Sequence, residues 1–186
     1  MRTTEIRVSG FGGQGVILCG YILGRAAALH GGKHATLTQS FGPEARGSAC
    51  SAQLIVSDDP VLYPYIKQAQ VLVCMSQEAY EKFEPEMAAG GTLLYEEDLV
   101  TIRPAREGIR QLGIPATRIA EELGRTIVVN IVMLGFLTAV TGLVPAEAAR
   151  KAVEESVPEG TQKLNLAAFD RGYEYGLKLV SKEVVR

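Results

Sequence analysis

The sequence predicts an α/β fold: a mostly parallel sheet with helices on both faces, followed by a helical C-terminal third. In the first part of the chain, short apolar segments with strand-like patterns alternate with segments of helical length. After residue 126 the pattern becomes helical and no strand-like segment intervenes. These two observations determine the predicted fold class.

The expected strands lie in the first two-thirds of the chain. Glu5 to Ser9 alternates apolar and polar residues, and Ala69 to Met75 is a nearly continuous apolar run, as in a strand covered on both faces. The segments expected to be strands are residues 5–9, 34–39, 49–56, 69–75, 92–95 and 98–103. Residues 109–114 are left open between strand and loop.

The expected helices follow from length and composition. Gly31 and Gly32 end the first of them, and Pro85 breaks or kinks the second. The segments expected to be helices are residues 16–29, 77–89, 127–144, 146–157 and 164–184. Without an internal repeat or a linker, residues 1–186 are expected to form a single domain with a three-layer α/β/α, Rossmann-like architecture.

The composition excludes several classes of function. With 19 basic and 21 acidic residues the net charge is −2, so no basic footprint for nucleic acid is present. Cys19, Cys50 and Cys74 are widely separated, which is the wrong spacing for zinc or iron–sulfur ligands and indicates reduced thiols. No apolar signal segment opens the chain. We therefore expect a cytoplasmic protein that holds no metal.

Residues 126–146 contain no charged residue and are long enough to cross a bilayer. Asn130 and several threonines interrupt the run, and Pro145 closes it. No second span and no basic flank asymmetry accompany it. A buried core helix is therefore favoured over a membrane helix.

Gly10, Gly12 and Gly15 match the pattern G-x-G-x-x-G between an expected strand and an expected helix. Glycines let the backbone turn sharply and approach a ligand, and the helix N-terminus attracts an anion. A dinucleotide site also needs an acidic residue at the end of the second strand. That strand ends in Thr38-Gln39-Ser40, and the first acid is Glu44. A dinucleotide-binding oxidoreductase therefore remains only an alternative, as does a tight crossover without a ligand.

A second loop, from Phe41 to Ser48, contains small residues around a pair of opposite charges. Glu44 and Arg46 lie two residues apart, and an arginine among small residues suits a carboxylate or a phosphate. The alternative is a solvated turn in which the two side chains pair with each other. Because both loops follow strands of one sheet, they are expected at its carboxyl edge.

Asn130 has two interpretations. If residues 127–129 end a strand, its side chain caps the following helix, and this reading is favoured. If the helix already runs through it, Asn130 is an amide that lines a pocket or bridges two helices. His30 and His34 have no acidic companion nearby in the sequence, so a catalytic pair is not expected.

The two loops together resemble the gamma subunit of 2-oxoacid:ferredoxin oxidoreductases, and the resemblance extends over nearly the whole chain. Further residues that carry it are Asn130, Met133, Gly135, Asn165, Ala168, Phe169 and Gly172. The family's arginine loop commonly ends in two glycines, whereas Ser48 holds the second position here.

The resemblance implies a subunit of a hetero-oligomeric enzyme. Such enzymes decarboxylate a 2-oxoacid on thiamine diphosphate and Mg²⁺, transfer the acyl group to coenzyme A, and pass electrons through iron–sulfur clusters to ferredoxin. This chain has neither cluster ligands nor a thiamine-binding tract, so the cofactors are expected in thiamine-binding and ferredoxin-like partner subunits of alpha, beta and delta type. A scaffolding module without a ligand is a further alternative.

The resemblance also implies where this chain contributes to the active site. The expected ligand loops comprise Gly10, Gly12, Gly13, Gln14, Gly15, Gly42, Pro43, Glu44, Arg46 and Gly47, together with Asn130. The first loop is expected to form a backbone wall to which Gln14 supplies an amide. Arg46 and Glu44 are expected near the entrance for substrate or coenzyme A, or across a subunit interface. The Gly-Pro-Glu-Ala-Arg-Gly loop resembles that of the 2-oxoglutarate, branched-chain and pyruvate enzymes more than that of the indolepyruvate type, and among these three substrates 2-oxoglutarate is the one expected.

Overall fold

The computed structural model describes residues 3–41 and 49–184. Its six strands are β1 (Thr3–Phe11), β2 (His34–Ser40), β3 (Ala49–Ser57), β4 (Val71–Cys74), β5 (Thr92–Glu96) and β6 (Arg110–Ile114). Its helices are α1 (Val16–Arg25), α2 (Gln77–Phe83), α3 (Ala116–Glu122), α4 (Val129–Thr141), α5 (Ala146–Ser156) and α6 (Gln162–Val184). A π-helical turn, Ala26–His30, extends α1.

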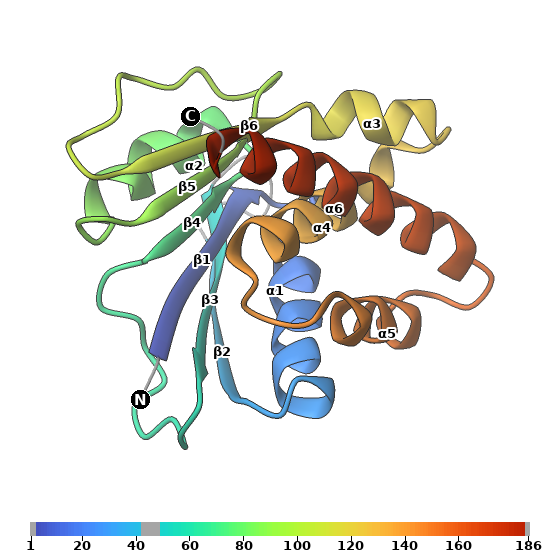
Figure 1. Cartoon of the computed structure of the whole chain (residues 1–186), viewed down its shortest axis with the longest axis horizontal. Coiled ribbons are helices and arrows are strands. Elements are labelled where there is room, and N and C mark those ends of the chain that lie inside the picture. The colour runs from blue at the N-terminus through green and yellow to red at the C-terminus, as the bar shows by residue number, and fades with distance from the viewer. Residues whose placement is uncertain (1–2, 42–48, 185–186) are drawn as a thin grey trace.

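The strands form one mixed sheet in the order β2-β3-β1-β4-β5-β6 (Figure 1). β1, β4, β5 and β6 are parallel, whereas β3 runs antiparallel to both β1 and β2. The mostly parallel α/β sheet that the sequence predicts is therefore confirmed. Residues 109–114, left open by the sequence, supply β6 at one edge.

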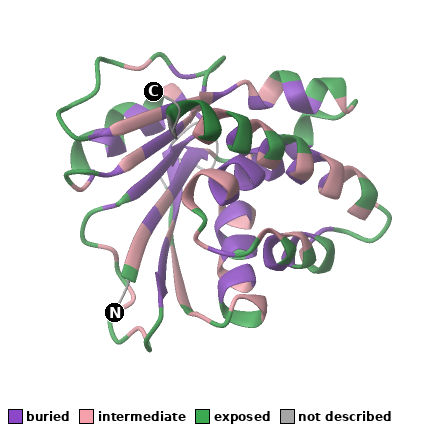
Figure 2. Cartoon of the chain, viewed as in Figure 1, coloured by how far each residue is buried: buried purple, intermediate pink, exposed green. Residues whose placement is uncertain are grey.

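Helices cover both faces of the sheet (Figure 1). Leu72, Cys74 and Leu93 pack with α2 on one face, in the smaller of two buried clusters. Val71, Val73 and Leu94 point to the other face, into the cluster that includes α1 and α4. This alternation is the period of two that a strand buried on both faces requires. Figure 2 shows the buried residues concentrated on the central strands and α4.

Helix α4 is the centre of the larger cluster, and it is buried from Asn130 to Thr138. This confirms the prediction of a core helix for the uncharged segment. It is shorter than expected: a 3₁₀ turn, Thr126–Val128, precedes it, and Gly142 ends it with φ of 57°. In the described part of the chain, no helix combines the length and the apolar character needed to cross a bilayer.

Helices α4 and α6 cross unusually closely at two glycines. A Cβ on Gly135 would collide with the Phe169 carbonyl oxygen, and one on Gly172 with the Val132 carbonyl oxygen. Such contact between backbones is possible only where one residue has no side chain. Several residues of the family resemblance thus form a helix crossing.

In the middle of the chain one prediction is wrong and another is confirmed in part. Residues 98–103 do not form a strand, because backbone groups of this segment bond to side chains: Thr101 N–H donates to Gln77 Oε1 and Arg103 N–H to the Tyr80 hydroxyl. The helix expected over residues 77–89 ends at Phe83, and the 3₁₀ turn that follows contains Pro85, so the break predicted at this proline is confirmed and the helix is shorter than expected. The short helix α3 has no counterpart among the sequence predictions.

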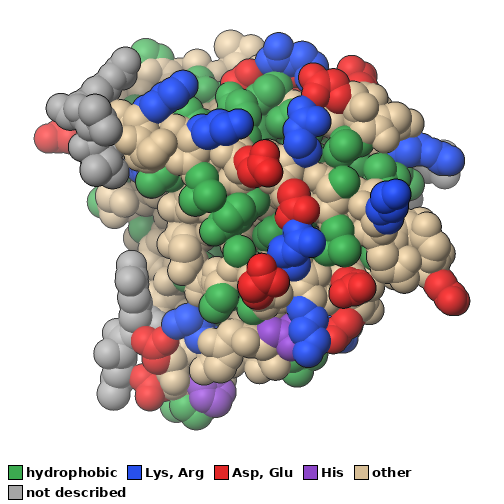
Figure 3. Space-filling view, turned by 45° about the vertical axis from the view of Figure 1, so that its right-hand side comes forward, with side chains coloured by type: hydrophobic (Ala, Val, Ile, Leu, Met, Phe, Trp, Pro, Cys, Tyr) green, Lys and Arg blue, Asp and Glu red, His purple; other side chains and the backbone are tan. Residues whose placement is uncertain are grey.

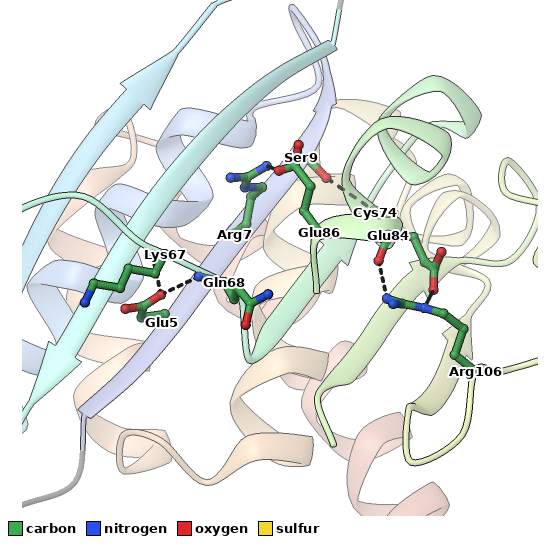
Figure 4. A network of polar contacts seen from close by, with 9 residues as sticks. All are labelled: Glu5, Arg7, Ser9, Lys67, Gln68, Cys74, Glu84, Glu86 and Arg106. Atoms are coloured by element: carbon green, nitrogen blue, oxygen red, sulfur yellow. Dashed lines mark hydrogen bonds and ion pairs between the residues drawn. The ribbon is translucent and has the colours of Figure 1, made fainter. Parts of the chain in front are cut away.

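Polar side chains on the α2 side attach one long loop to β1 and another to the 3₁₀ turn after α2 (Figure 4). The Glu5 carboxylate accepts the backbone N–H groups of Lys67 and Gln68, at 2.6 and 2.9 Å. The Arg106 guanidinium donates to Glu84 at 2.8 Å. On the helical side, Figure 3 shows basic and acidic side chains interspersed, without a patch of one sign.

The three cysteines are buried free thiols, as the sequence predicts. Burial raises the pKa of Cys19 and of Cys74 to about 12. We expect an alkylating reagent at neutral pH to label them only after unfolding, because the reactive species is the thiolate. Mass spectrometry of native and urea-unfolded samples measures this, and equal labelling rates in the two samples would contradict it.

Candidate functional site

The carboxyl ends of the parallel strands meet at one edge of the sheet, where α/β proteins bind ligands. β1 ends there, and β2 ends there too, because both run antiparallel to β3. Phe11 at the end of β1 lies opposite Ala49 at the start of β3. The connection between β2 and β3 therefore leaves the sheet beside the glycine loop that follows β1.

Five predicted site residues belong to this connection: Gly42, Pro43, Glu44, Arg46 and Gly47. All of them lie outside the described residues. The described flanks are Phe41, whose side chain is exposed, and Ala49, which is buried. Their roles remain those expected from the sequence.

The predicted glycine loop joins β1 to α1. Gly10 is the penultimate residue of β1, packed against Met75 and Val16, and Gly12 lies in the exposed turn that follows. Gly13 and Gly15 have φ angles of 96° and 71°, which residues other than glycine rarely adopt. The pattern is therefore required by the backbone of a sharp strand-to-helix turn.

Gln14 braces this turn. Its Oε1 accepts the Phe11 N–H at 2.7 Å, and its Nε2 donates to the Met75 carbonyl oxygen at 2.9 Å. Met75 follows β4, so one amide ties the loop after β1 to the end of the neighbouring strand. Because backbone groups engage both ends of the amide, Gln14 acts here as a positioning residue.

Asn130 is not a helix cap, and the favoured prediction for it is wrong. It is the second residue of α4, and Val128 occupies the cap position. Its Nδ2 donates to the Gly15 carbonyl oxygen at 3.2 Å, an oxygen that also accepts the Cys19 N–H. The second interpretation, an amide bridging two helices, is the one observed, because α4 packs against the start of α1.

The strand order explains the absence of a ribose-binding carboxylate. In a dinucleotide-binding domain, the strand after the first helix lies beside the first strand. Here β3 separates β2 from β1, so the end of β2 is one strand further from the glycine loop. This arrangement counts against the dinucleotide alternative.

A pocket of about 550 Å³ opens beside the glycine loop. The first turns of α1, α4 and α6 converge on it, through Leu18, Asn130 and Leu164. Helix N-termini carry partial positive charge and free N–H groups, so their convergence favours an anionic group. Its remaining lining residues are Gly13, Gly15, Arg125, Ile127, Val128, Val157, Pro158, Gly160, Thr161 and Asn165.

Polar groups accompany the apolar wall of this pocket. Arg125 is exposed at its rim and forms no ion pair with any described residue. Asn165 is buried, and its Nδ2 donates to the carbonyl and hydroxyl oxygens of Thr161. Sequence reasoning did not name Arg125 or Thr161, which lie more than a hundred residues from the glycine loop. Asn130 and Asn165, which the sequence analysis did name, line the same pocket, and the arginine directly before the uncharged segment is a further signal that could have pointed to it.

Glu96 ends β5 at the same edge and is fully buried. Its Oε1 accepts the Thr117 N–H at 3.3 Å, whereas Oε2 has no hydrogen bond to any described residue. Burial raises the pKa of this carboxyl above its ordinary value of 4.5. Hydrogen bonds from the backbone oppose that rise without cancelling it.

Replacing Glu96 with glutamine is expected to make the fold less sensitive to rising pH. Because the pKa of Glu96 is higher in the folded than in the unfolded protein, its protonated form stabilises the fold fully at a pH below the unfolded-state pKa. That stabilisation is lost as the pH rises through the folded-state pKa. E96Q keeps an acceptor oxygen and carries no charge, so its stability relative to the parent should increase between pH 4.5 and neutrality. Urea denaturation across that range measures the difference, with the exposed Glu107→Gln as control. A constant difference at all pH values would refute the assignment.

No three of the histidine, cysteine and acidic residues in the described segments are arranged to hold a metal ion. His30 does have an acidic neighbour that the sequence concealed: its Nε2 lies 3.0 Å from Glu155 Oε2. The two residues are 125 positions apart in the chain. Arg25 shares the same carboxylate, which makes the group a surface ion pair between α1 and α5.

A model of the pyruvate ferredoxin/flavodoxin oxidoreductase family matches residues 5–175, which include the glycine loop and most of the helices around the pocket. The chain belongs to this family. The family resemblance carried by the two loops is therefore confirmed.

Relatives within the family share the whole length of the chain. The 2-oxoglutarate synthase subunit KorC of Methanocaldococcus jannaschii is 50% identical, over 94% of this chain and 95% of that protein. The ketoisovalerate oxidoreductase subunit VorA of Methanothermobacter thermautotrophicus is 33% identical, over 97% of this chain and 38% of that longer protein. The keto/oxoacid ferredoxin oxidoreductase gamma subunit of Geobacter sulfurreducens has the same fold, with a TM-score of 0.87 and 41% identity, covering 96% and 98% of the two chains.

Proposed function

We propose that this chain is the gamma subunit of a 2-oxoacid:ferredoxin oxidoreductase that acts on 2-oxoglutarate. The supporting observation is the 50% identity to a 2-oxoglutarate synthase subunit along nearly the full length of both chains. Identity falls to 33% for the ketoisovalerate relative, which favours 2-oxoglutarate as substrate. The overall reaction converts 2-oxoglutarate, coenzyme A and oxidised ferredoxin to succinyl-CoA, CO₂ and reduced ferredoxin.

Within such an enzyme this chain contributes walls and positioning groups. Thiamine diphosphate with Mg²⁺ and the iron–sulfur clusters belong to thiamine-binding and ferredoxin-like partner subunits, and together they supply the decarboxylation and electron transfer. The proposed assembly is a cytoplasmic hetero-oligomer, and residues 1–186 form its single gamma-type domain. The continuous buried cluster that joins the sheet to α4, α5 and α6 supports a single domain.

The pocket beside Gly13 fits an anionic ligand that also has an apolar part, such as coenzyme A. Three helix N-termini and Arg125 favour phosphate, whereas Leu18, Val128 and Leu164 provide apolar contact. Gln14 and Asn130 would hold the glycine wall in place without reacting.

The proposal is tested by co-expressing the chain with thiamine-binding and ferredoxin-like partner subunits. The purified complex is assayed for ferredoxin reduction with 2-oxoglutarate, pyruvate and ketoisovalerate, each with and without coenzyme A. We expect activity that depends on coenzyme A and is highest with 2-oxoglutarate. A preference for another 2-oxoacid would overturn the substrate assignment. NAD(P)H binding by the isolated chain in place of complex formation would favour the dinucleotide alternative.

Arg46→Ala is expected to lower acyl-CoA formation by the complex or to prevent its assembly, because a guanidinium among small residues in the sequence suits an anion or a partner carboxylate. Turnover and size-exclusion profile are measured together. The control is Arg171→Ala, the same change at an exposed ion pair with Glu122, where little effect is expected. If turnover and assembly were unchanged in Arg46→Ala, Arg46 would neither bind an anionic substrate group nor contribute to a subunit interface.

A further inference from the structure

Strand β2 is an edge of the sheet without the usual protection. It pairs only with β3, and no described residue donates to or accepts from its outer backbone groups. Its sequence, His-Ala-Thr-Leu-Thr-Gln-Ser, contains no proline, lysine, arginine or acid. Natural proteins usually protect edge strands with charges, prolines, bulges or short length, because open edges pair with other strands.

The opposite edge, β6, has such protection. It is five residues long and begins with Arg110, which pairs with Glu183 of α6. The Gln111 side chain donates to the Arg103 carbonyl oxygen, so the preceding loop runs alongside this strand. The contrast between the two edges shows that β2 is left open selectively.

An apolar groove of about 310 Å³ lies beside β2 on the helical face of the sheet. Ala35 and Leu37 of β2 and Leu54 of β3 form its floor. Tyr21 and Leu29 from the α1 side remain 45% and 60% exposed at its rim. The apolar lining of the groove therefore extends from the helix to the open edge.

The other face of β2 is polar. Thr36 and Thr38 lie there, opposite Ile55 and Gln53 of β3. The Thr38 hydroxyl is buried and has no hydrogen-bond partner among the described residues. A buried hydroxyl without a partner is uncommon in a folded protein. The strand therefore lacks partners along its backbone edge and on its apolar face.

We propose that β2 pairs antiparallel with β2 of a second copy of this chain, about a twofold axis that passes through Leu37 perpendicular to the sheet. The two six-stranded sheets then become one continuous sheet. Such an axis places the helical faces of the two sheets on the same side. The apolar grooves of the two copies therefore lie next to each other, and each covers the other. Leu37 lies opposite Leu37 of the second copy.

The strand is complementary to itself in this register. Thr36 lies opposite Thr38 of the second copy, so threonine side chains face each other on the polar face. Ala35 lies opposite Gln39, and His34 opposite Ser40, so no pair brings two like charges together. Threonine pairs on one face are favourable cross-strand contacts. These matches favour a second copy over an unrelated strand as the occupant.

The test uses paired charge variants of the full chain. In Thr36→Lys/Thr38→Lys, each new lysine faces a lysine of the second copy, and like charges directly opposite are destabilising. In Thr36→Glu/Thr38→Lys, each new charge faces its opposite in the proposed register. Sedimentation equilibrium measures the dimer dissociation constant, and circular dichroism confirms that both variants fold.

We expect a dimer for the parent chain, about a tenfold or larger rise in dissociation constant for the double lysine variant, and recovery in the Glu/Lys variant. A monomeric parent chain at all concentrations would overturn the proposal. Equal weakening by both variants would overturn the register about Leu37. In the complex with its partner subunits, loss of a partner subunit instead of the second copy would show that a partner strand occupies β2, and would also refute the proposal.

Discussion

Replacing Gly172 with alanine is expected to lower the free energy of unfolding by about 3 kcal/mol, the largest effect on stability that we predict. The new Cβ would overlap the Val132 carbonyl oxygen, a backbone atom that moves only if the whole helix moves. Helices α4 and α6 would have to separate, and the buried contacts of Phe136 and Phe169 between them would loosen. Urea denaturation monitored by circular dichroism measures the change.

Gly24→Ala is the matched control for this prediction. Gly24 also lies inside a helix, α1, but a Cβ there would meet only the end of the Leu54 side chain, at 3.2 Å. Because alanine favours a helix over glycine, this variant should range from unchanged to about 1 kcal/mol more stable. If Gly172→Ala were as stable as Gly24→Ala, the close helix crossing would be incorrect.

Gly15→Ala is expected to have the largest effect on function. It combines two penalties: a left-handed φ of 71°, and overlap of the new Cβ with the Asn130 amide, whose Cγ would lie at 2.7 Å. The start of α1 would shift relative to α4, and the pocket wall would shift with it. Since displacements of about 1 Å in a site can lower rates about 100-fold, we expect turnover of the assembled complex to fall by about 10-fold to 100-fold.

Two further variants separate the two penalties. Gly13→Ala introduces the backbone strain alone, about 1–2 kcal/mol, because no atom lies within 4 Å of its Cβ position. Asn130→Ala removes the amide that Gly15→Ala would meet. The double variant Gly15→Ala/Asn130→Ala should therefore be more stable than the sum of the single changes predicts. Strict additivity would show that the two residues do not interact.

Periodicity and glycine placement predicted much of the fold. The strands now labelled β1 to β5 lie where apolar alternation or a continuous apolar run placed them, because burial on one or both faces is written into that pattern. The prediction of a strand over residues 98–103 is wrong because side chains of α2, distant in the sequence, accept hydrogen bonds from its backbone N–H groups. No local pattern contains that competition.

The direction of β3 was also beyond local reasoning. Alternating strands and helices predict parallel neighbours, yet β2 and β3 are antiparallel neighbours. In the sheet, β3 lies between β1 and β2. The order of the strands depends on which strands pair in the folded protein. The separation between the glycine loop and β2 therefore becomes known only from the structure of the sheet.

The sequence by itself determined the class of fold, the family and the glycine loop. The glycine loop is local, because it consists of a strand, a turn that only glycine allows, and a helix that are adjacent in the chain. The fold class follows from alternating strand and helix patterns, and the family from the resemblance of the two loops. Tertiary structure alone decided the pocket, the role of Asn130 and the open edge at β2. Asn130 reaches Gly15 across 115 positions, and three helix starts converge on one cavity. Such contacts depend on how buried faces pack together, and a one-dimensional pattern records only that those faces are apolar.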